Sequence, residues 1–129
     1  MDPIADMLTR IKNAGLVHNE TCVLPYSKLK FEIVNVLLKD GFIKSFSVKG
    51  KKVRKHIEVE IAYGEDGTAR IEDVKRVSKN SRRIYLGFRD IKLVKQGKGM
   101  LILSTPKGVM NGRDARKQSL GGEALFSIW

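Results

Sequence analysis

The spacing of apolar residues changes along this chain, and that change limits the folds it can adopt. Near the N-terminus, apolar residues recur every three or four positions, as on one face of a helix: Ile4, Met7, Leu8 and Ile11. After Gly41 the period falls to two, and residues 56–63 alternate apolar and polar side chains as a half-buried strand does. Helices that lie early and strands that dominate late predict an α+β fold.

Capping residues mark two helices in the first part of the chain. Asp2 is a good N-cap with Pro3 at the first helical position, and Gly15 can close this helix. Ser27 can cap a second helix that ends at Gly41. The apolar face of the second helix is expected to consist of Leu29, Ile33, Val36 and Leu37.

Strands account for most of the rest and fall into two groups. The first group is expected over 21–26, 42–48 and 56–63. The polar turn at 64–67 is the best boundary between an N-terminal α-β-α-β-β lobe (1–64) and a β-rich C-terminal lobe (65–129) packed on it. Elements of the second lobe are expected as strands over 70–77, 83–86, 100–104 and 123–128, with short helical turns near 89–94 and 112–117.

The chain carries a formal net charge of +11, unevenly placed. Residues 1–64 hold 11 Lys/Arg and 7 Asp/Glu, a net of +4, whereas residues 65–129 hold 14 and 7, a net of +7. A basic excess of this size favours polyanionic partners, of which nucleic acid is the commonest. The second half is therefore the better candidate for a nucleic-acid interface.

The sequence points away from membranes and secretion. No apolar run approaches the ~20 residues that span a bilayer, and no basic amphipathic helix with exposed aromatic residues is apparent. The N-terminus lacks the basic start and long apolar stretch of a secretory signal. The single cysteine, Cys22, forms no internal disulfide and lies in an apolar segment, as a buried structural thiol would. We therefore expect a monomer in the reducing cytoplasm, without a membrane partner.

Catalysis has little support. His18 and His56 lie far apart in sequence and belong to no recognisable nucleophile or metal pattern. Glu58 and Glu60 share one strand face, and a metal-dependent nuclease built on them stays open as an alternative, although a solvated strand face is the simpler interpretation. We expect no enzyme activity, no metal and no cofactor.

Two cationic segments are candidates for RNA contact. Residues 49–55 hold five cations in seven positions, which suits phosphate binding without sequence readout, although such runs are also common on solvated surfaces. In Arg82-Arg83-Ile84-Tyr85, cations stand beside an aromatic ring that can stack on a nucleobase. The same ring would equally fit a protein core, and both interpretations of Tyr85 stay open.

The segment Ser104-Thr105-Pro106-Lys107-Gly108 has the strongest binding chemistry and directly follows an apolar strand. Each hydroxyl can donate and accept a hydrogen bond, so Ser104 and Thr105 can meet a ribose 2′-OH, a base edge or a phosphate. Pro106 restricts the loop, Lys107 supplies a cation, and Gly108 lets the backbone approach closely. An ordinary turn with a helix cap is the alternative.

These motifs resemble the bacterial form of the eighth protein of the small ribosomal subunit. The likeness covers the whole chain. It begins with residues 2–14, includes Ser104–Gly108 and Arg113-Asp114-Ala115-Arg116, and ends with Gly121-Gly122-Glu123 and a terminal Trp129. The resemblance implies a cytoplasmic, ribosome-associated protein that binds and organises the central domain of small-subunit ribosomal RNA, beside neighbouring small-subunit proteins. Members of this family commonly also repress their own operon by binding its messenger RNA.

The family resemblance also implies particular contact residues. The C-terminal lobe would grip an irregular RNA helix through Ser104, Thr105, Pro106, Lys107 and Gly108, with Tyr85 and the turn Gly121, Gly122, Glu123 beside them. Gly121 and Gly122 would let their turn pass close to RNA, and Glu123 would accept from a backbone N–H or, as the second choice, from a guanine edge. In the N-terminal lobe, Thr9 and Asn13 would touch a second RNA segment from the polar face of the first helix.

The chain departs from the family pattern at two places. Pro106 stands where the family usually has serine, and the turn 79–82 (Lys-Asn-Ser-Arg) replaces a turn with glycine and proline before Tyr85. Two rival functions also stay open beside ribosomal RNA binding and the nuclease. One is a repressor that acts mainly on messenger RNA, and the other is a module that binds acidic proteins.

Overall fold

The computed structural model describes residues 2–129, which form two compact units. The N-terminal unit is residues 3–72, and the C-terminal unit is residue 2 together with 73–129. The division thus follows Glu72, later than the turn at 64–67. That turn stays inside the N-terminal unit because the chain folds back after it: Gly64 N–H donates to Thr68 O (2.8 Å) and Arg70 N–H to Ala62 O (2.9 Å). The α+β class is confirmed.

Helix α1 (Pro3–Leu16) follows the expected apolar stripe, with Ile4, Met7, Leu8 and Ile11 buried. Gly15 does not end the helix as we expected. It is buried within α1, and a Cβ built on it would lie 2.9 Å from the Cβ of Ala69. A glycine here allows the helix to pack closely against the returning chain, and the helix continues to Leu16.

Helix α2 (Lys28–Lys39) begins at the expected cap. The Ser27 hydroxyl accepts from the backbone N–H of Lys30 (3.1 Å), and Gly41 after the helix has φ +80°, a left-handed conformation that suits glycine. Ile33, Val36 and Leu37 are buried as expected. Leu29 is exposed instead, and Val34 takes its place in the core.

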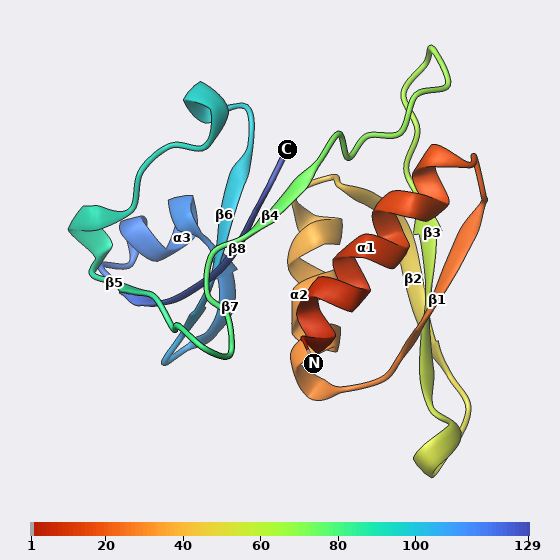
Figure 1. Ribbon diagram of the computed structural model, residues 1–129, viewed down its shortest axis with the longest axis horizontal. Coiled ribbons are helices and arrows are strands. Elements are labelled where there is room, and N and C mark those ends of the chain that lie inside the picture. Colours follow the sequence, from red (N-terminus) through yellow and green to blue (C-terminus); the bar gives the residue numbers. More distant parts are fainter. Residues whose placement is uncertain (1) are drawn as a thin grey trace. The chain divides into compact units, whose positions relative to one another are not determined.

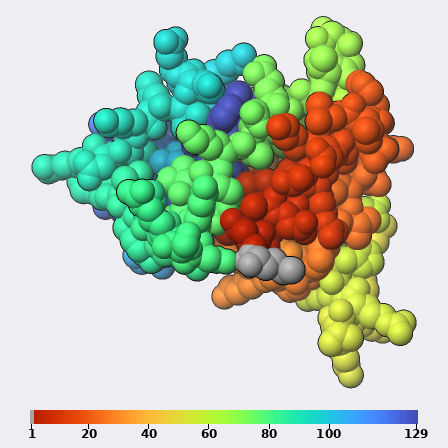
Figure 2. Space-filling view, viewed as in Figure 1, coloured from red at the N-terminus to blue at the C-terminus, as the bar shows by residue number. Residues whose placement is uncertain are grey.

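A three-stranded antiparallel sheet completes the N-terminal unit. Its strands are β1 (Thr21–Pro25), β2 (Ile43–Lys49) and β3 (His56–Ile61), in the order β1-β3-β2. Both helices lie on one face of this sheet (Figure 1), the face to which β3 turns Ile57, Val59 and Ile61. The β2–β3 hairpin carries a 3₁₀ turn, η1 (Lys52–Arg54), at its tip, and this tip protrudes from the unit (Figure 2).

The C-terminal unit is built on a five-stranded antiparallel sheet in the order β4-β8-β6-β7, with β5 also paired to β8. These strands are β4 (Val74–Arg76), β5 (Tyr85–Leu86), β6 (Met100–Thr105), β7 (Gly108–Asn111) and β8 (Gly122–Ile128). The first two are shorter than the expected strands over 70–77 and 83–86. Strand β7 is an addition, since no strand was expected there.

One face of this second sheet is covered by the short helix α3 (Gly112–Lys117), which Asn111 caps, and by the segment that contains η2 (Phe88–Asp90) and η3 (Lys95–Gly97). The buried cluster under them consists of Ile91, Leu101, Leu103, Ala115 and Ala124. Within residues 2–129, no helix is long and apolar enough to cross a membrane.

Candidate nucleic-acid interface

The segment Ser104–Gly108 is the turn of a tight β6–β7 hairpin. Thr105 pairs with Gly108 across the hairpin, so that only Pro106 and Lys107 connect the two strands. Proline suits the first connecting position because its φ is fixed near −65°. Gly108 has φ +113°, which only glycine adopts readily. The turn is therefore rigid and presents the side chain of Lys107 to solvent.

Thr105 and Ser104 have different roles in the hairpin. The side chain of Thr105 is buried (8% exposed), and its hydroxyl donates to the carbonyl of Gly108 (2.7 Å) and accepts from the N–H of Lys107 (3.2 Å). The hydroxyl of Ser104 makes no hydrogen bond to another residue within 2–129 and lies in a half-buried side chain. Thr105 thus holds the shape of the turn, whereas Ser104 and Lys107 are open to a ligand.

Gly121 and Gly122, at the N-terminal end of β8, lie in close contact with the backbones of neighbouring segments. A Cβ on Gly122 would lie 2.1 Å from the carbonyl oxygen of Ser104, and a Cβ on Gly121 would lie 2.4 Å from that of Leu86. No side chain can occupy either place without moving the backbone. The glycines therefore allow β8 to lie close to β6 and to the end of β5, a structural reason for their presence that the sequence alone did not indicate.

Strand pairing brings the expected residues into one row. Glu123 lies opposite Tyr85 on one side and opposite Ser104 on the other, and Ser104 in turn faces Val109. Directly paired residues in a sheet project from the same face. Tyr85 is 70% exposed on that face, so it is not a core residue. The row places an accessible aromatic ring, a carboxylate and a hydroxyl side by side.

The carboxylate of Glu123 forms an ion pair with Arg83. Arg83 donates through Nη1 to Glu123 Oε2 at 3.0 Å, and this hydrogen bond raises the pKa of the Arg83 guanidinium. We had expected a backbone N–H or a guanine edge to donate to Glu123, and the structure places the Arg83 guanidinium there instead. Because arginine has five N–H donors, Arg83 retains donors for a further anion. The sequence marks Arg83 as cationic, but its acidic partner lies 40 positions away.

A buried serine positions the strand that carries Tyr85. The Ser78 hydroxyl accepts from the N–H of Ile84 (2.8 Å) and donates to the carbonyl of the same residue (3.2 Å), and Ser78 is fully buried. In the turn between Ser78 and Ile84, the backbones of Lys79 and Arg82 exchange hydrogen bonds of 2.9 and 3.0 Å. The turn without glycine or proline therefore still closes tightly before β5. Ser78 could not be identified from the sequence, because nothing there distinguishes it from a surface serine.

The basic tip, which we define as residues 49–55, is a second cationic region and belongs to the N-terminal unit. Lys49 pairs with Glu58 (3.1 Å), and Lys55 lies over the ring of Tyr26 (4.3 Å). The other three cations of the tip have no acidic partner among the described residues: Lys51, Lys52 and Arg54. The tip therefore presents three exposed cations on a short turn.

The two strand carboxylates proposed for a nuclease are each held by a lysine. Glu58 pairs with Lys49, and Glu60 pairs with Lys44 (3.1 Å) and accepts from the hydroxyl of Ser45 (3.0 Å). Within residues 2–129, no group of three or more acidic, histidine or cysteine side chains has a geometry that suits a metal ion. The arrangement is that of a paired strand surface.

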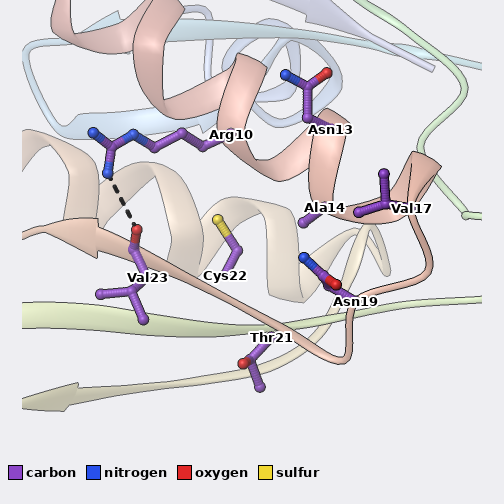
Figure 3. A pocket seen from close by; sticks show the side chains of 8 residues that line it. All are labelled: Arg10, Asn13, Ala14, Val17, Asn19, Thr21, Cys22 and Val23. Carbon is purple, nitrogen blue, oxygen red and sulfur yellow. Dashed lines mark hydrogen bonds between the residues drawn. The ribbon is translucent and has the colours of Figure 1, made fainter.

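Thr9 and Asn13 lie on the exposed side of α1, in the N-terminal unit, whereas the other expected contact residues belong to the C-terminal unit. Asn13 also lines a pocket of about 500 Å³ between α1 and β1. Figure 3 shows the lining residues, which are Arg10, Asn13, Ala14, Val17, Asn19, Thr21, Cys22 and Val23. Burial raises the pKa of the Cys22 thiol, and nearby Arg10 partly opposes that shift.

Comparison with known proteins identifies the family of the chain. Residues 2–129 match the family model described as Ribosomal protein S8. Relatives named small ribosomal subunit protein uS8 include those of Vesicomyosocius okutanii (48% identical), Anaeromyxobacter dehalogenans (46%) and Helicobacter pylori (42%). Each alignment spans 128 residues, 99% of this chain and 97 or 98% of the relative. The chain belongs to the ribosomal protein S8 family.

Proposed function

We propose that this chain is a structural constituent of the small ribosomal subunit that binds the central domain of its ribosomal RNA and organises it during assembly. The observation that carries the proposal is the row on the C-terminal sheet. In it, exposed Tyr85 on β5 and half-buried Ser104 on β6 flank Glu123, and Lys107 lies in the adjoining β6–β7 turn. Relatives that bear the name of a small-subunit protein support the same conclusion.

The mechanism is recognition of an irregular RNA helix by a preformed surface. The internal bonds of Thr105 and the fixed φ of Pro106 hold the turn before binding, which lowers the entropy lost on association. Ser104 can meet a 2′-OH or a base edge, Lys107 a phosphate, and the ring of Tyr85 an unstacked base. Gly108 and the Gly121–Gly122 turn keep side chains away from the RNA backbone.

The negative charge of Glu123 would repel the RNA phosphates if it were unpaired. The ion pair with Arg83 neutralises it and at the same time fixes the guanidinium beside Tyr85. We propose that Arg83 uses its remaining donors for phosphate and adds to the contacts that the sequence indicates.

The N-terminal unit would add contacts of two kinds. Thr9 and Asn13 would touch a second RNA segment from the polar side of α1, and the basic tip would contribute phosphate contacts that depend on salt. We further propose that the protein is a cytoplasmic monomer outside the ribosome, and that neighbouring small-subunit proteins contact it within the ribosome.

Repression of its own operon is the second proposed role. A surface that reads the shape of an irregular helix does not distinguish which molecule carries that helix, so a messenger RNA with the same local shape would occupy the same site. Competition between the two RNAs for one protein would then couple synthesis of the protein to the supply of ribosomal RNA.

The test is a binding titration against a fragment of the small-subunit central domain and a scrambled RNA of equal length, at two salt concentrations. We expect strong preference for the native fragment, and loss of that preference in a Ser104→Ala/Lys107→Ala variant. Lys117→Ala is the matched control, because this exposed cation lies on α3, which covers the opposite sheet face. Equal binding to both RNAs would contradict the proposal.

Two further arms of the titration separate the alternatives. A leader RNA from the protein's operon should compete with the central-domain fragment if repression is retained. The bound RNA should stay intact in the presence of Mg²⁺. Cleavage that is lost in Glu58→Gln would instead support the nuclease, and preference for an acidic protein over any RNA would support an interaction module.

A further inference from the structure

We infer that the pocket between α1 and β1 receives a single unstacked nucleotide of the bound RNA. The inference rests on the proposed RNA binding and identifies a ligand for one place in the N-terminal unit. A pocket of about 500 Å³ falls within the range of roughly 300–1,000 Å³ that is typical of small-ligand sites. One nucleoside is a ligand of this class, whereas a duplex is too wide to enter.

The polar lining suits the edge of a nucleobase. The side-chain amides of Asn13 and Asn19 make no hydrogen bond to any other residue within 2–129, and both line the pocket. An amide presents two donors and one acceptor, the combination that pairs with the mixed donors and acceptors of a base edge. In Figure 3, Asn13 projects from α1 and Asn19 from the segment that leads to β1, so two different elements supply these groups.

The apolar lining suits the face of a base. Val17 is 67% exposed and lines the pocket beside Ala14. Val23 contributes its backbone carbonyl, which accepts from Arg10, while its side chain lies on the other sheet face, opposite Glu58. A planar ring placed against Val17 and Ala14 would remove apolar surface from water on both sides of the contact. An aliphatic side chain of another protein would also do this, but it would leave the two amides without partners.

A cation that can bind a phosphate, Arg10, also lines the pocket. Arg10 donates from Nη1 to the carbonyl of Val23 (3.5 Å) and from Nε to the carboxylate of Asp6 (3.2 Å). Both side chains of this ion pair are about half exposed, and exposed pairs contribute little that a phosphate could not replace. These two contacts leave the other N–H donors of the guanidinium for an anion.

The single cysteine of the chain provides a reporter inside this pocket. Cys22 lies in the lining, and Figure 3 shows its sulfur directed from β1 toward α1. A nucleotide in the pocket would therefore block reagents from the thiol. The test measures the rate of alkylation of Cys22 at alkaline pH with and without a saturating central-domain fragment. We expect the fragment to slow alkylation at least tenfold, and the scrambled RNA to leave it unchanged.

A variant tests the recognition itself. Asn13→Ala/Asn19→Ala should still bind the fragment through the C-terminal unit, with roughly tenfold lower affinity for two lost hydrogen bonds, and should lose the protection of Cys22. The control is Asn35→Ala, an exposed amide on α2 that bonds the carbonyl of Phe31. As a direct measurement, an RNA with 4-thiouridine at its unpaired positions should photocrosslink to the peptide that contains residues 17–23.

The outcomes separate this inference from the proposed function. Tight binding of the fragment that depends on Ser104 and Lys107, without protection of Cys22, would overturn the pocket and leave the proposed function standing. Absence of preferential binding would overturn both. Protection that requires a neighbouring small-subunit protein rather than RNA would also overturn the inference, because the occupant would then be a protein side chain.

Discussion

The β6–β7 and β2–β3 hairpins are both turns between antiparallel strands, yet they suit different tasks. The β6–β7 turn has two connecting residues, one cation and a network of internal bonds centred on Thr105. The basic tip of the β2–β3 hairpin has three cations without acidic partners among the described residues, and Val53 at its end is 99% exposed. Separate parts of this molecule thus supply charge and shape.

The difference follows from what surrounds each turn. In the C-terminal unit, Gly122 lies against the backbone of Ser104, so the β6–β7 turn is fixed by a third strand. The basic tip has no such neighbour, and its own bonds, Arg54 N–H to Lys51 O (3.1 Å) and Lys55 N–H to Lys52 O (3.2 Å), close it locally. A fixed turn can discriminate between RNA shapes, whereas a free cationic tip adds affinity for any polyanion.

The largest effect is expected from glycine substitutions that place a Cβ against a backbone carbonyl in each hairpin region. Gly122→Ala should lower the free energy of unfolding by about 3 kcal/mol or more, because β6 must move away from β8. Gly50→Ala also puts a Cβ 2.4 Å from a carbonyl, that of Arg54, but the exposed tip can rearrange, so the expected cost is about 1 kcal/mol. Urea unfolding of both variants measures the difference.

Gly67→Ala is the control for backbone conformation alone. Gly67 has φ +84°, and a Cβ there would have no atom within 4 Å. Its cost should therefore match the conformational part of the Gly50→Ala cost. Equal destabilisation by Gly122→Ala and Gly50→Ala would remove the distinction between a fixed and a free turn.

The second prediction separates the two neighbouring hydroxyls of the β6 end. Thr105→Val removes both internal hydrogen bonds at nearly constant volume and should cost about 1–2 kcal/mol of stability together with most of the preference for native RNA. Ser104→Ala should leave stability unchanged and lower RNA affinity roughly fivefold, for one lost hydrogen bond. Thermal unfolding and the RNA titration, run on both variants, would contradict this if Ser104→Ala were the less stable protein.

Local signals in the sequence predict the scaffold of the N-terminal unit well. The Ser27 cap, the helical stripe of α1 and the alternation of β3 depend on neighbouring residues, and the structure confirms them. Strand β7 has no comparable signal, because its four residues contain a glycine and an asparagine and acquire strand structure only by pairing with β6. Gly15 looks like a helix end for the same reason, since its packing partner Ala69 is distant in sequence.

The sequence predicts which residues belong to the candidate site more easily than it predicts the role of each one. Hydroxyl chemistry allows Thr105 to bind RNA or to bind its own turn, and only the hairpin register brings the carbonyl of Gly108 within 2.7 Å. The pairing of Glu123 with Arg83 likewise depends on β5 and β8 lying side by side. Long-range register, which one sequence does not reveal, decides which side chains remain open to a ligand.

The third prediction concerns the charge of the basic tip. Substituting Lys51, Lys52 and Arg54 by glutamine should reduce the slope of log affinity against log salt by about 2, since each phosphate contact contributes about 0.7–0.9. The ratio between native and scrambled RNA should stay unchanged, because the tip reads no shape. Titrations at several salt concentrations measure both quantities. A fall in that ratio would show that the tip takes part in recognition.

The smallest effect concerns the strands below that tip, where lysines neutralise both carboxylates. The pKa of Glu60 lies below its ordinary value of 4.5, first because Lys44 hydrogen-bonds to it and then because Ser45 does. A lowered folded-state pKa stabilises the protein above the unfolded-state pKa, and this contribution is lost as the pH falls through the folded-state value. Since Glu60 is partly open to solvent, which weakens its effect on stability, NMR titration of its carboxyl is a better measure than unfolding.

Ser45→Ala should raise the pKa of Glu60 toward 4.5, because one of the two side-chain bonds to the charged form is removed. Ser47→Ala is the matched control, since Ser47 lies on the same strand opposite Glu58 instead of Glu60. An unchanged Glu60 pKa in Ser45→Ala would mean that Lys44 alone sets it. If both serine variants behave as expected, the positive field of this hairpin is confined to its tip by pairing along β2 and β3, and the contrast with the β6–β7 turn then lies in where charge is left unpaired.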